Sequence, residues 1–546
     1  MSRGIPLALA LAAQLTAPLA VVPAQTPDAT PRLVVVIVID QLRRDRLDPG
    51  LPGGLGMLAR EGRVYAEGVL DHAITDTCPG HVSIVTGHHP GPAGVPGNVH
   101  LSRATGQLEY CVSDPTPEGA LLGMPPGPHG RSPHKIRVTA LGDWLKLAHP
   151  DARVFSVSQK DRAAIAMGGR RPDGAYWLLP RGPAGFTTSH YYAAELPTWV
   201  KHWNGTDPLT DGYLARVPQR WEYVFPLKSE RPDDYPSEAD KFSRTSPHPL
   251  RGEDLAETLS AISVSPFDDR LTLEFARELV RNEGLGRDET PDLLAISLAA
   301  TDRVGHMYGP ESHESHDALH RLDVDLAAFF AFLGEQVGRG RTLVALSADH
   351  GVLPLPEWLV ETGRSRCPLD DGRANQWWLA SRLNFALWRE FSRLFSWPDG
   401  LVQFSNKSIN VDRALAAEHG VDPGRVAEFT ERWLEARPEI ARVWTRTEIA
   451  EGTDAFAALY RNSLDPERSG DLTVQVHEDC RISSYSEGTG HGSPYLYDRA
   501  VPIVFFGPGI ERGVVPGRAR TVDIAPTLAR ALGLSTPPGL DGVPLD

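Results

Sequence analysis

The chain has 546 residues, more than an ordinary single core needs, and a large α/β enzyme with insertions accommodates this length. Its formal net charge is −15 and its sequence pI is near 5.7, without a basic run, so we expect no nucleic-acid partner. The acidic balance would repel an anion only weakly at long range, so bulk charge does not decide the ligand.

The first residues are typical of a secretory signal. Arg3 provides a positive start, LALALAA an apolar region, and the small residues ending at Ala24 a cleavage site. Gln and Pro interrupt the apolar run, and no other segment is long and apolar enough to span a bilayer. We therefore expect residues 1–24 to be removed, no stable membrane span, and a periplasmic or secreted protein.

Strand-like runs alternate with helical patterns along the chain. The strand-like runs lie at 33–39, 153–157, 293–299, 342–348 and 501–506, and helical patterns include 137–148, 315–337 and 520–533. This alternation predicts an α/β fold with a mostly parallel central sheet and helices on both faces. Two stretches, about 171–262 and 353–470, break the rhythm with Pro, Gly and Trp, and are interpreted as insertions that cover the site.

One motif near the N-terminus resembles a nucleotide-binding fingerprint. Gly54, Gly56 and Ala59 match G-x-G-x-x-A, yet they lie well past the strand-like run that ends at Ile39 instead of directly after it. A helix around GLGMLAREG explains them better, so we expect no nucleotide cofactor.

Three acidic residues each follow a strand-like run. Asp40 comes after VVVIVI, Asp302 after LLAISLAA, and Asp349 after TLVALSA. Any one of them alone would be a turn former or a helix N-cap. Open α/β sheets bind ligands at the carboxyl ends of their strands, so together the three predict one shared site.

Three histidines accompany these acids. His350 adjoins Asp349, His306 lies four residues after Asp302, and His491 lies in the glycine-rich GTGHG. Gly305 favours a loop, not a helix, between Asp302 and His306, and each His alone could be an ordinary surface residue. Imidazole and carboxylate are zinc ligands, and with the Thr77 hydroxyl the set suffices for two zinc ions.

These motifs resemble the alkaline phosphatase superfamily, in the branch of type I phosphodiesterases and nucleotide pyrophosphatases. The chain is most similar to the bacterial phosphate-irrepressible (PafA-type) alkaline phosphatases with a Thr nucleophile. The resemblance runs from about residue 32 to the C-terminus, so it implies a catalytic domain over 25–546. Its eight ordered anchors are VVVIVIDQLRRD, TCPGHVSIVTG, GVPGN, SQKDRAAI, TDRVGHMYGP, SADHGV, GTGHGSP and VDIAPTLARALG.

The resemblance also implies the roles of individual residues. It assigns Asp302, His306 and His491 to one zinc, and a second zinc to Asp40, Thr77, Asp349 and His350. The nucleophile of the family lies two residues before the Pro of its T-x-P segment, which selects Thr77 and not Thr75. A Thr hydroxyl is a poor nucleophile until a metal activates it.

Asn98 lies 98 − 77 = 21 residues after Thr77, the interval that the resemblance implies for a phosphate-contacting Asn. An ordinary turn Asn beside Gly97 is the alternative. The family often has His where this chain has Ala93. That His is not among the implied ligands, so the departure weighs little.

Lys160 and Arg162 bear on the substrate class. A phosphate monoester is a dianion, whereas one oxygen of a diester carries a second carbon group. Two cations aimed at those oxygens favour the monoester, and the resemblance agrees, because diesterase relatives lack this pair. Without the other motifs, the tripeptide Lys160-Asp161-Arg162 would be interpreted as a solvent-exposed turn.

Four cysteines, without a CxxC pair, fit an oxidising compartment better than a zinc knuckle. Cys78 adjoins Thr77 and is the less expected nucleophile. Two disulfides are expected, with Cys78–Cys111 and Cys367–Cys480 as the working assignment and other pairings open.

The sequence therefore predicts a secreted two-zinc alkaline phosphatase that hydrolyses small-molecule phosphate monoesters through a phosphothreonine. The alternatives are a phosphodiesterase or nucleotide pyrophosphatase with the same metals, and a non-catalytic zinc- or phosphate-binding protein, which would have no need of Thr77. No oligomeric state is predicted.

Overall fold

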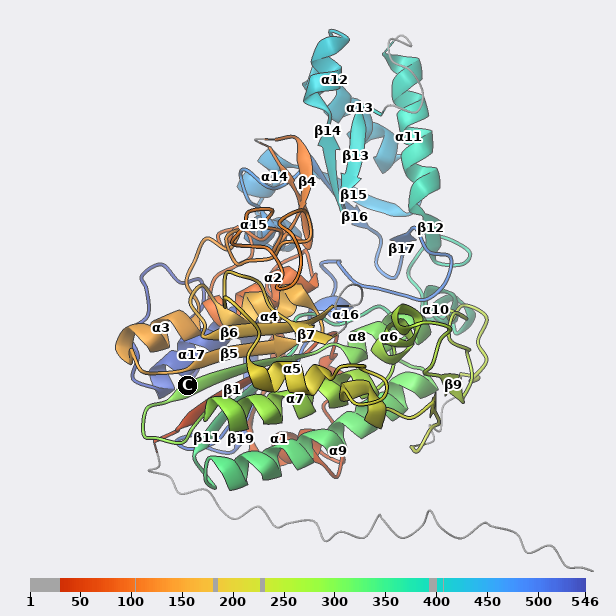
Figure 1. Cartoon of the computed structure of the whole chain (residues 1–546). Helices are drawn as coiled ribbons and strands as arrows, with labels where there is room; N and C mark the ends of the chain where they lie inside the picture. Colours follow the sequence, from red (N-terminus) through yellow and green to blue (C-terminus); the bar gives the residue numbers. More distant parts are fainter. Residues whose placement is uncertain (1–29, 104, 180–184, 226–230, 392–399, 406) are drawn as a thin grey trace, which may run out of the picture.

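A computed structural model describes residues 30–546, apart from residues 104, 180–184, 226–230, 392–399 and 406 (Figure 1). The expected signal peptide, residues 1–24, lies outside the described residues. Within the part of the chain that is described, no helix combines the length and the apolar character that a bilayer crossing requires.

A nine-stranded mixed sheet forms the centre of the protein (Figure 1). Its strands, in spatial order, are β19 (Gly513–Arg520), β2 (Arg63–Val69), β18 (Val504–Phe506), β11 (Thr342–Ser347), β1 (Leu33–Ile39), β10 (Asp292–Leu298), β5 (Val154–Ser158), β6 (Gly174–Leu179) and β7 (Gly185–Thr187). The central strands from β11 to β6 run parallel, which confirms the predicted sheet. β18 runs antiparallel to both of its neighbours, a direction that a strand-like run alone does not reveal.

Helices cover both faces of this sheet. All seven residues of β1 are buried, and successive side chains enter two different cores, because neighbouring residues of a strand point to opposite faces. Helices packed into the first core include α1 (Gly54–Glu61), α7 (Phe267–Glu283) and α9 (His313–Gln336). The second core includes residues of α2 (Thr77–Thr86), α3 (Leu141–Ala148) and α17 (Ile524–Ala531).

Several helices match their predicted positions. α3, α9 and α17 lie within or close to the three predicted helical ranges, and α1 covers GLGMLAREG. The 3-10 turn η3 (Thr521–Asp523) precedes α17. α1 thus accounts for the three small residues that match the nucleotide fingerprint.

Much of segment 171–262 packs with the main sheet. It supplies the edge strand β7 and its neighbour β6, and also α5 (Thr198–Asn204), η2 (Tyr213–Arg216), β8 (Arg220–Trp221), β9 (His248–Pro249) and α6 (Leu255–Ser263). Phe186, Val200 and Trp221 lie in the core that also contains β1 residues. The aromatic side chains of this segment are therefore largely packing residues.

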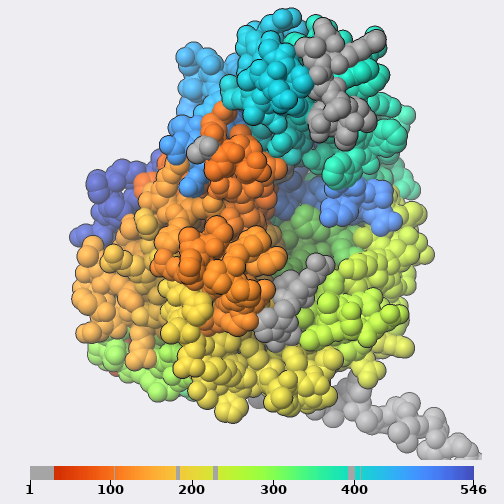
Figure 2. All heavy atoms as spheres, turned by 45° about the horizontal axis from the view of Figure 1, so that its top comes forward, coloured from red at the N-terminus to blue at the C-terminus, as the bar shows by residue number. Residues whose placement is uncertain are grey.

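Most of segment 353–470 contributes to a separate lobe (Figure 1). A four-stranded sheet of β13 (Val402–Ser405), β14 (Ser408–Val411), β16 (Leu472–Val476) and β15 (Ile440–Thr445) packs with α11 (Gln376–Glu390), α12 (Arg413–Glu418) and α13 (Pro423–Glu435) around its own apolar core. The other elements of the C-terminal half are α10 (Pro356–Glu361), β12 (Arg373–Asn375), α14 (Arg446–Glu451), α15 (Ala455–Ser463), β17 (Arg481–Ser483) and α16 (Leu496–Arg499). A space-filling view shows a hollow between the lobe and the main body (Figure 2).

Both working disulfide assignments are confirmed. Cys78 pairs with Cys111, and Cys367 pairs with Cys480. The first bond ties the beginning of α2 to the end of the hairpin formed by β3 (Val99–Ser102) and β4 (Gln107–Tyr110). It therefore holds Thr77, the first residue of α2, close to that hairpin.

His89, in the loop after α2, lies between two carboxylates, Asp71 before α2 and Asp541 near the C-terminus. His89 Nε2 donates to Asp71 Oδ2 at 2.8 Å, and its Nδ1 lies 3.4 Å from Asp541 Oδ1. Burial disfavours the imidazolium, but the interactions with Asp541 and Asp71 outweigh it and raise the pKa of His89 to about 9.

This raised pKa predicts a stability difference on the alkaline side. A histidine whose folded pKa exceeds its ordinary value of 6.5 stabilises the fold fully below that value, and loses the contribution as pH rises through about 9. We expect His89→Gln to lower the free energy of unfolding by roughly 2–3 kcal/mol at pH 6 and much less at pH 10. Urea denaturation at both pH values measures this, with the exposed His202→Gln as control. Equal losses at the two pH values would contradict an ionic role.

Candidate active site

Three buried carboxylates meet at the carboxyl ends of the three central strands. Asp40 follows β1, Asp349 follows β11, and Asp302 lies in α8 (Ala300–Tyr308), just after β10. Since these strands are adjacent and parallel, their ends place the three acids at one edge of the sheet, as the sequence predicts.

The expected loop between Asp302 and His306 is wrong, because both residues lie in helix α8. Gly305 serves a different purpose there. The side-chain oxygen of Gln41 approaches so closely that a Cβ on Gly305 would lie 1.9 Å from it. The glycine therefore makes room for a neighbouring side chain and does not break the helix.

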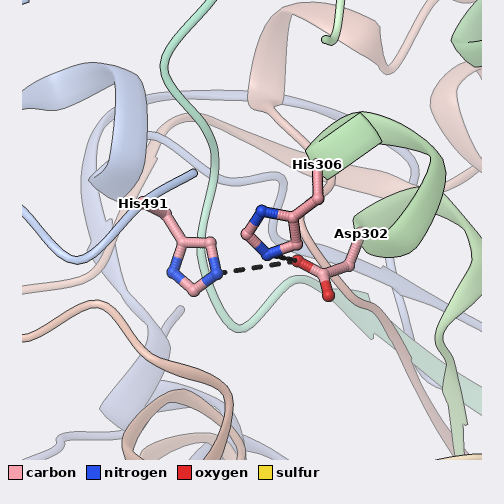
Figure 3. A group of neighbouring side chains, drawn as sticks. All are labelled: Asp302, His306 and His491. Atoms are coloured by element: carbon pink, nitrogen blue, oxygen red, sulfur yellow. Dashed lines mark ion pairs between the residues drawn. The ribbon is translucent and has the colours of Figure 1, made fainter. Parts of the chain in front are cut away.

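The first cluster of potential ligands consists of Asp302, His306 and His491 (Figure 3). His306 Nε2 lies 3.1 Å and His491 Nε2 lies 3.6 Å from Asp302 Oδ1. One potential ligand atom of each residue lies within 4.8 Å of those of the others. The three side chains converge from α8 and from the GTGHG loop.

The second cluster consists of Asp40, Asp349 and His350. His350 Nε2 lies 3.5 Å from Asp40 Oδ1 and 3.4 Å from Asp349 Oδ2. All three atoms are buried and have no hydrogen-bond partner within the described part of the chain. Buried polar atoms are nearly always satisfied, so three unsatisfied ligand atoms that face each other fit a cation.

The three predicted histidine ligands share one orientation. Nδ1 of His306 donates to Thr489 O at 2.7 Å, and Nδ1 of His491 donates to Thr75 O at 2.7 Å. Nδ1 of His350 lies 3.0 Å from Gly351 O. A carbonyl only accepts, so each ring carries its proton on Nδ1 and presents Nε2 to the acids. Metal-bound histidines are held in this way.

Lys160 connects the two clusters. Its ammonium lies 2.7 Å from Asp40 Oδ2 and also bonds the Asp302 carboxylate. Burial, with the neighbouring Asp302 and Asp349 charges, raises the pKa of Asp40 to about 6. One ammonium among three buried carboxylates leaves excess negative charge, and two divalent cations would compensate it. The residues therefore fit a pair of metal ions.

Two neighbours of these clusters were missed from the sequence. Gln41, at φ 71°, donates from Nε2 to Asp302 Oδ1 at 2.7 Å and from its backbone to Asp349 Oδ1. His81 lies 3.3 Å from Asp349 Oδ2. His81 follows Thr77 by four residues in TCPGH, a helical spacing that could have marked it. Nothing in the spacing of Gln41 marks it.

Thr77 lies at the N-terminus of α2, where backbone N–H groups favour an anion. Arg162 Nη2 lies 3.3 Å from Thr77 Oγ1, and Nη1 lies 3.4 Å from the Tyr110 hydroxyl. The Asp161 carboxylate instead binds Arg131 and Tyr110. Within the described ranges the Arg162 guanidinium has no carboxylate partner, and its Nε is buried and unbonded. Its charge is directed at Thr77.

Asn98 and Thr75 differ in what their side chains bind. Asn98 Oδ1 accepts from the Cys78 backbone N–H at 2.8 Å, so the amide nitrogen remains to donate elsewhere. Thr75 Oγ1 instead donates to Ser493 O and accepts from Gly492 N, which holds the loop that contains His491. Of the two threonines, Thr77 is the one whose hydroxyl meets a cationic side chain.

Comparison with known proteins identifies the family of the chain. The family profile of type I phosphodiesterase / nucleotide pyrophosphatase matches residues 34–497. Alkaline phosphatase PafA of Elizabethkingia meningoseptica is 31% identical over 545 residues, covering 96% of this chain and 95% of that protein. Alkaline phosphatase PhoK of a Sphingomonas species is 32% identical, covering 94% and 91%. A Myroides odoratus protein named calcium-transporting ATPase is 30% identical, covering 94% of each chain.

The crystal structure of wild-type PafA is similar throughout, with a TM-score of 0.85, 30% identity, and coverage of 94% of this chain and 98% of that one. A solved PafA variant has one Thr changed to Ser and one Asn, one Lys and one Arg changed to Ala. Those four positions are spaced by 21, 62 and 2 residues, the same intervals that separate Thr77, Asn98, Lys160 and Arg162.

Proposed function

Because the chain belongs to the type I phosphodiesterase / nucleotide pyrophosphatase family, we infer that it is an alkaline phosphatase, a hydrolase of phosphate monoesters. The observation that carries this is the Arg162 guanidinium, which has no carboxylate partner among the described residues and lies 3.3 Å from Thr77 Oγ1, beside two clusters of potential metal ligands. A buried cation beside a hydroxyl at a helix N-terminus suits a phosphate dianion.

Two zinc ions per chain are part of the proposal. Asp302, His306 and His491 would hold one, and Asp40, Asp349, His350 and the Thr77 oxygen the other. Zinc bound there would polarise the phosphoryl group and lower the pKa of the Thr77 hydroxyl. The orientation of the three histidines and the unbonded ligand atoms support this assignment.

Thr77 is the proposed nucleophile. Its oxygen attacks phosphorus while the bond between phosphorus and the ester oxygen breaks, and the alcohol leaves with a proton. Water then attacks the phosphothreonine, which releases phosphate and restores the hydroxyl. Arg162 and the Asn98 amide would bind the non-bridging oxygens in both steps.

Lys160 has a second part in this scheme. Its position between Asp40 and Asp302 places one ammonium beside both proposed zinc sites. We propose that it contacts the dianion and also neutralises the acids that carry the metals. The two negative charges of a phosphate monoester would therefore interact with both Lys160 and Arg162. A diester carries one negative charge fewer, so the pair favours monoesters over diesters.

A direct comparison of substrates tests the function. The purified protein should hydrolyse a phosphate monoester much faster than a matched diester of the same leaving group, with kcat/KM measured for both at one pH. A preference for the diester would support the phosphodiesterase alternative. Binding of zinc and phosphate without turnover of either ester would support the non-catalytic one.

Metal removal has a definite expected result. Prolonged dialysis against a chelator should abolish monoesterase activity, and Zn²⁺ should restore it, because the proposed site relies on metal charge. Elemental analysis should find two zinc ions per active chain. The double variant Asp302→Asn with His306→Ala should retain one zinc ion per chain. An active wild-type protein that contains one metal ion or none would contradict the two-ion site. Both affinity and activity should fall in acid, because His ligands must be neutral to bind.

The compartment and the domain plan also remain proposals. The two disulfides fit an oxidising compartment, and with the expected signal at residues 1–24 they support a periplasmic or secreted enzyme. We propose one catalytic domain over 25–546, in which the lobe built largely from 353–470 covers the site.

A further inference from the structure

A hairpin of the lobe reaches the segment that contains Asn98. Strands β13 and β14 form this hairpin, and Lys407 lies in its turn. Ser405 Oγ, two residues before Lys407, donates to Val99 O at 3.4 Å, and Val99 follows Asn98. The turn that carries Lys407 is therefore beside the proposed phosphate-binding segment.

Arg481, the first residue of β17, contacts the loop that carries the proposed zinc ligand His491. Its guanidinium packs against Gly490, the residue before His491, and a Cβ on Gly490 would lie 2.1 Å from Nη1. The missing side chain at Gly490 thus admits the guanidinium beside a proposed zinc ligand. Its Nη2 bond to Ser483 Oγ is long, at 3.4 Å, and its Nε is buried without a partner.

Lys407 and Arg481 are close to each other and to the site. Burial, and next the charge of Arg481, lower the pKa of Lys407 to about 8. Burial, and next the charge of Arg373, lower the pKa of Arg481 to about 10. Lys407 also acts electrostatically on Asp76, the residue before Thr77. The two cations therefore lie on segments that contact the Asn98 region and the His491 loop, and they act on each other electrostatically.

Neither cation forms an ion pair among the described residues, although the Asp498 carboxylate acts electrostatically on both. The neighbouring cations differ in this respect, because Lys160 pairs with Asp40 and Arg373 pairs with Glu357. Both side chains are partly buried, and a partly buried charge without an ion-pair partner is free to bind a ligand of opposite charge. The scissile phosphate already has Arg162, Asn98 and Lys160. A second anion is the missing partner.

We propose that Lys407 and Arg481 bind a second anionic group, a carboxylate or a phosphate, on the alcohol portion of the monoester substrate. Figure 2 shows a hollow between the lobe, to which β14 belongs, and the main body, which carries the proposed phosphate site. The inference rests on the proposed phosphatase function and narrows its substrates to phosphate monoesters with an anionic leaving group.

Three propyl compounds test the proposal with the zinc-loaded enzyme. n-Propyl phosphate is the neutral reference, 3-phosphooxypropanoate adds a carboxylate, and propane-1,3-diyl bisphosphate adds a phosphate. Wild type should prefer at least one anionic compound in kcat/KM. Lys407→Met should reduce that preference about tenfold, and Lys407→Met with Arg481→Gln about a hundredfold, with n-propyl phosphate little affected. Arg481→Lys should retain most of it.

Controls separate this inference from the function on which it rests. Arg432→Gln removes an exposed charge of the same lobe and should leave the preference unchanged. If Lys407→Met lowers the preference for only one of the two anionic compounds, that compound identifies the anion that the subsite binds. A wild type without preference, or an unchanged preference in Lys407→Met with normal zinc content and thermal stability, overturns the subsite alone. If the double variant does not fold, the change in preference measured for Lys407→Met alone tests the subsite. A wild type inactive on all three compounds overturns the phosphatase function itself.

Discussion

Thr77→Ala should reduce kcat for phosphate monoesters by at least about a thousandfold, because it removes the atom that attacks phosphorus. The three acids and three histidines remain, so the variant should keep at least the zinc held by Asp302, His306 and His491. Thr77→Ser retains a hydroxyl at the N-terminus of α2, within reach of Arg162, and should keep part of the activity.

Acid trapping during turnover, followed by peptide mapping, identifies the phosphorylated residue. Phosphate should be found on Thr77 in the wild type and on no residue in Thr77→Ala. Phosphate on Thr75, whose hydroxyl holds the His491 loop, would contradict the assignment. So would turnover without any trapped phosphoprotein under conditions that preserve phosphothreonine.

Lys160→Ala with Arg162→Ala should lower monoesterase kcat/KM by about a hundredfold to ten-thousandfold, because two charge-assisted contacts are each worth roughly 1.5–3 kcal/mol. A diester offers less charge to those groups and should lose far less. The ratio of monoesterase to diesterase kcat/KM should therefore fall by at least about tenfold. Equal losses on both substrates would show that the pair supports the fold alone.

The single variants separate two roles that the pair combines. Arg162 has no carboxylate partner among the described residues, so Arg162→Ala should affect the substrate and leave the zinc content unchanged. Lys160 bonds Asp40 and Asp302, so Lys160→Ala should also change zinc affinity, which a competing chelator measures. An unaltered zinc affinity in Lys160→Ala would limit that residue to the substrate.

The central strands and the carboxylates at their ends could be predicted from sequence because both depend on local pattern. A buried parallel strand must be apolar along its whole length, as VVVIVI is, and the residue that ends it lies at the ligand-binding edge wherever the strand pairs. Asp40, Asp302 and Asp349 could therefore be placed at strand ends from the sequence, and they converge because β11, β1 and β10 are adjacent and parallel. No comparable local pattern determines which cysteines pair, so the two disulfide assignments needed the structure for confirmation.

Contacts between distant segments required the tertiary structure, because residue spacing does not measure distance through space. Gly305 suggested a loop until Gln41, far away in the chain, was seen to occupy the space beside it. His81 became a neighbour of Asp349 only when α2 was placed against the sheet edge. Whether Lys160, Arg162, Lys407 and Arg481 have carboxylate partners likewise depends on burial and packing. The sequence by itself indicated the candidate ligands and the candidate nucleophile, and only the fold showed which of their charged neighbours are paired within the protein.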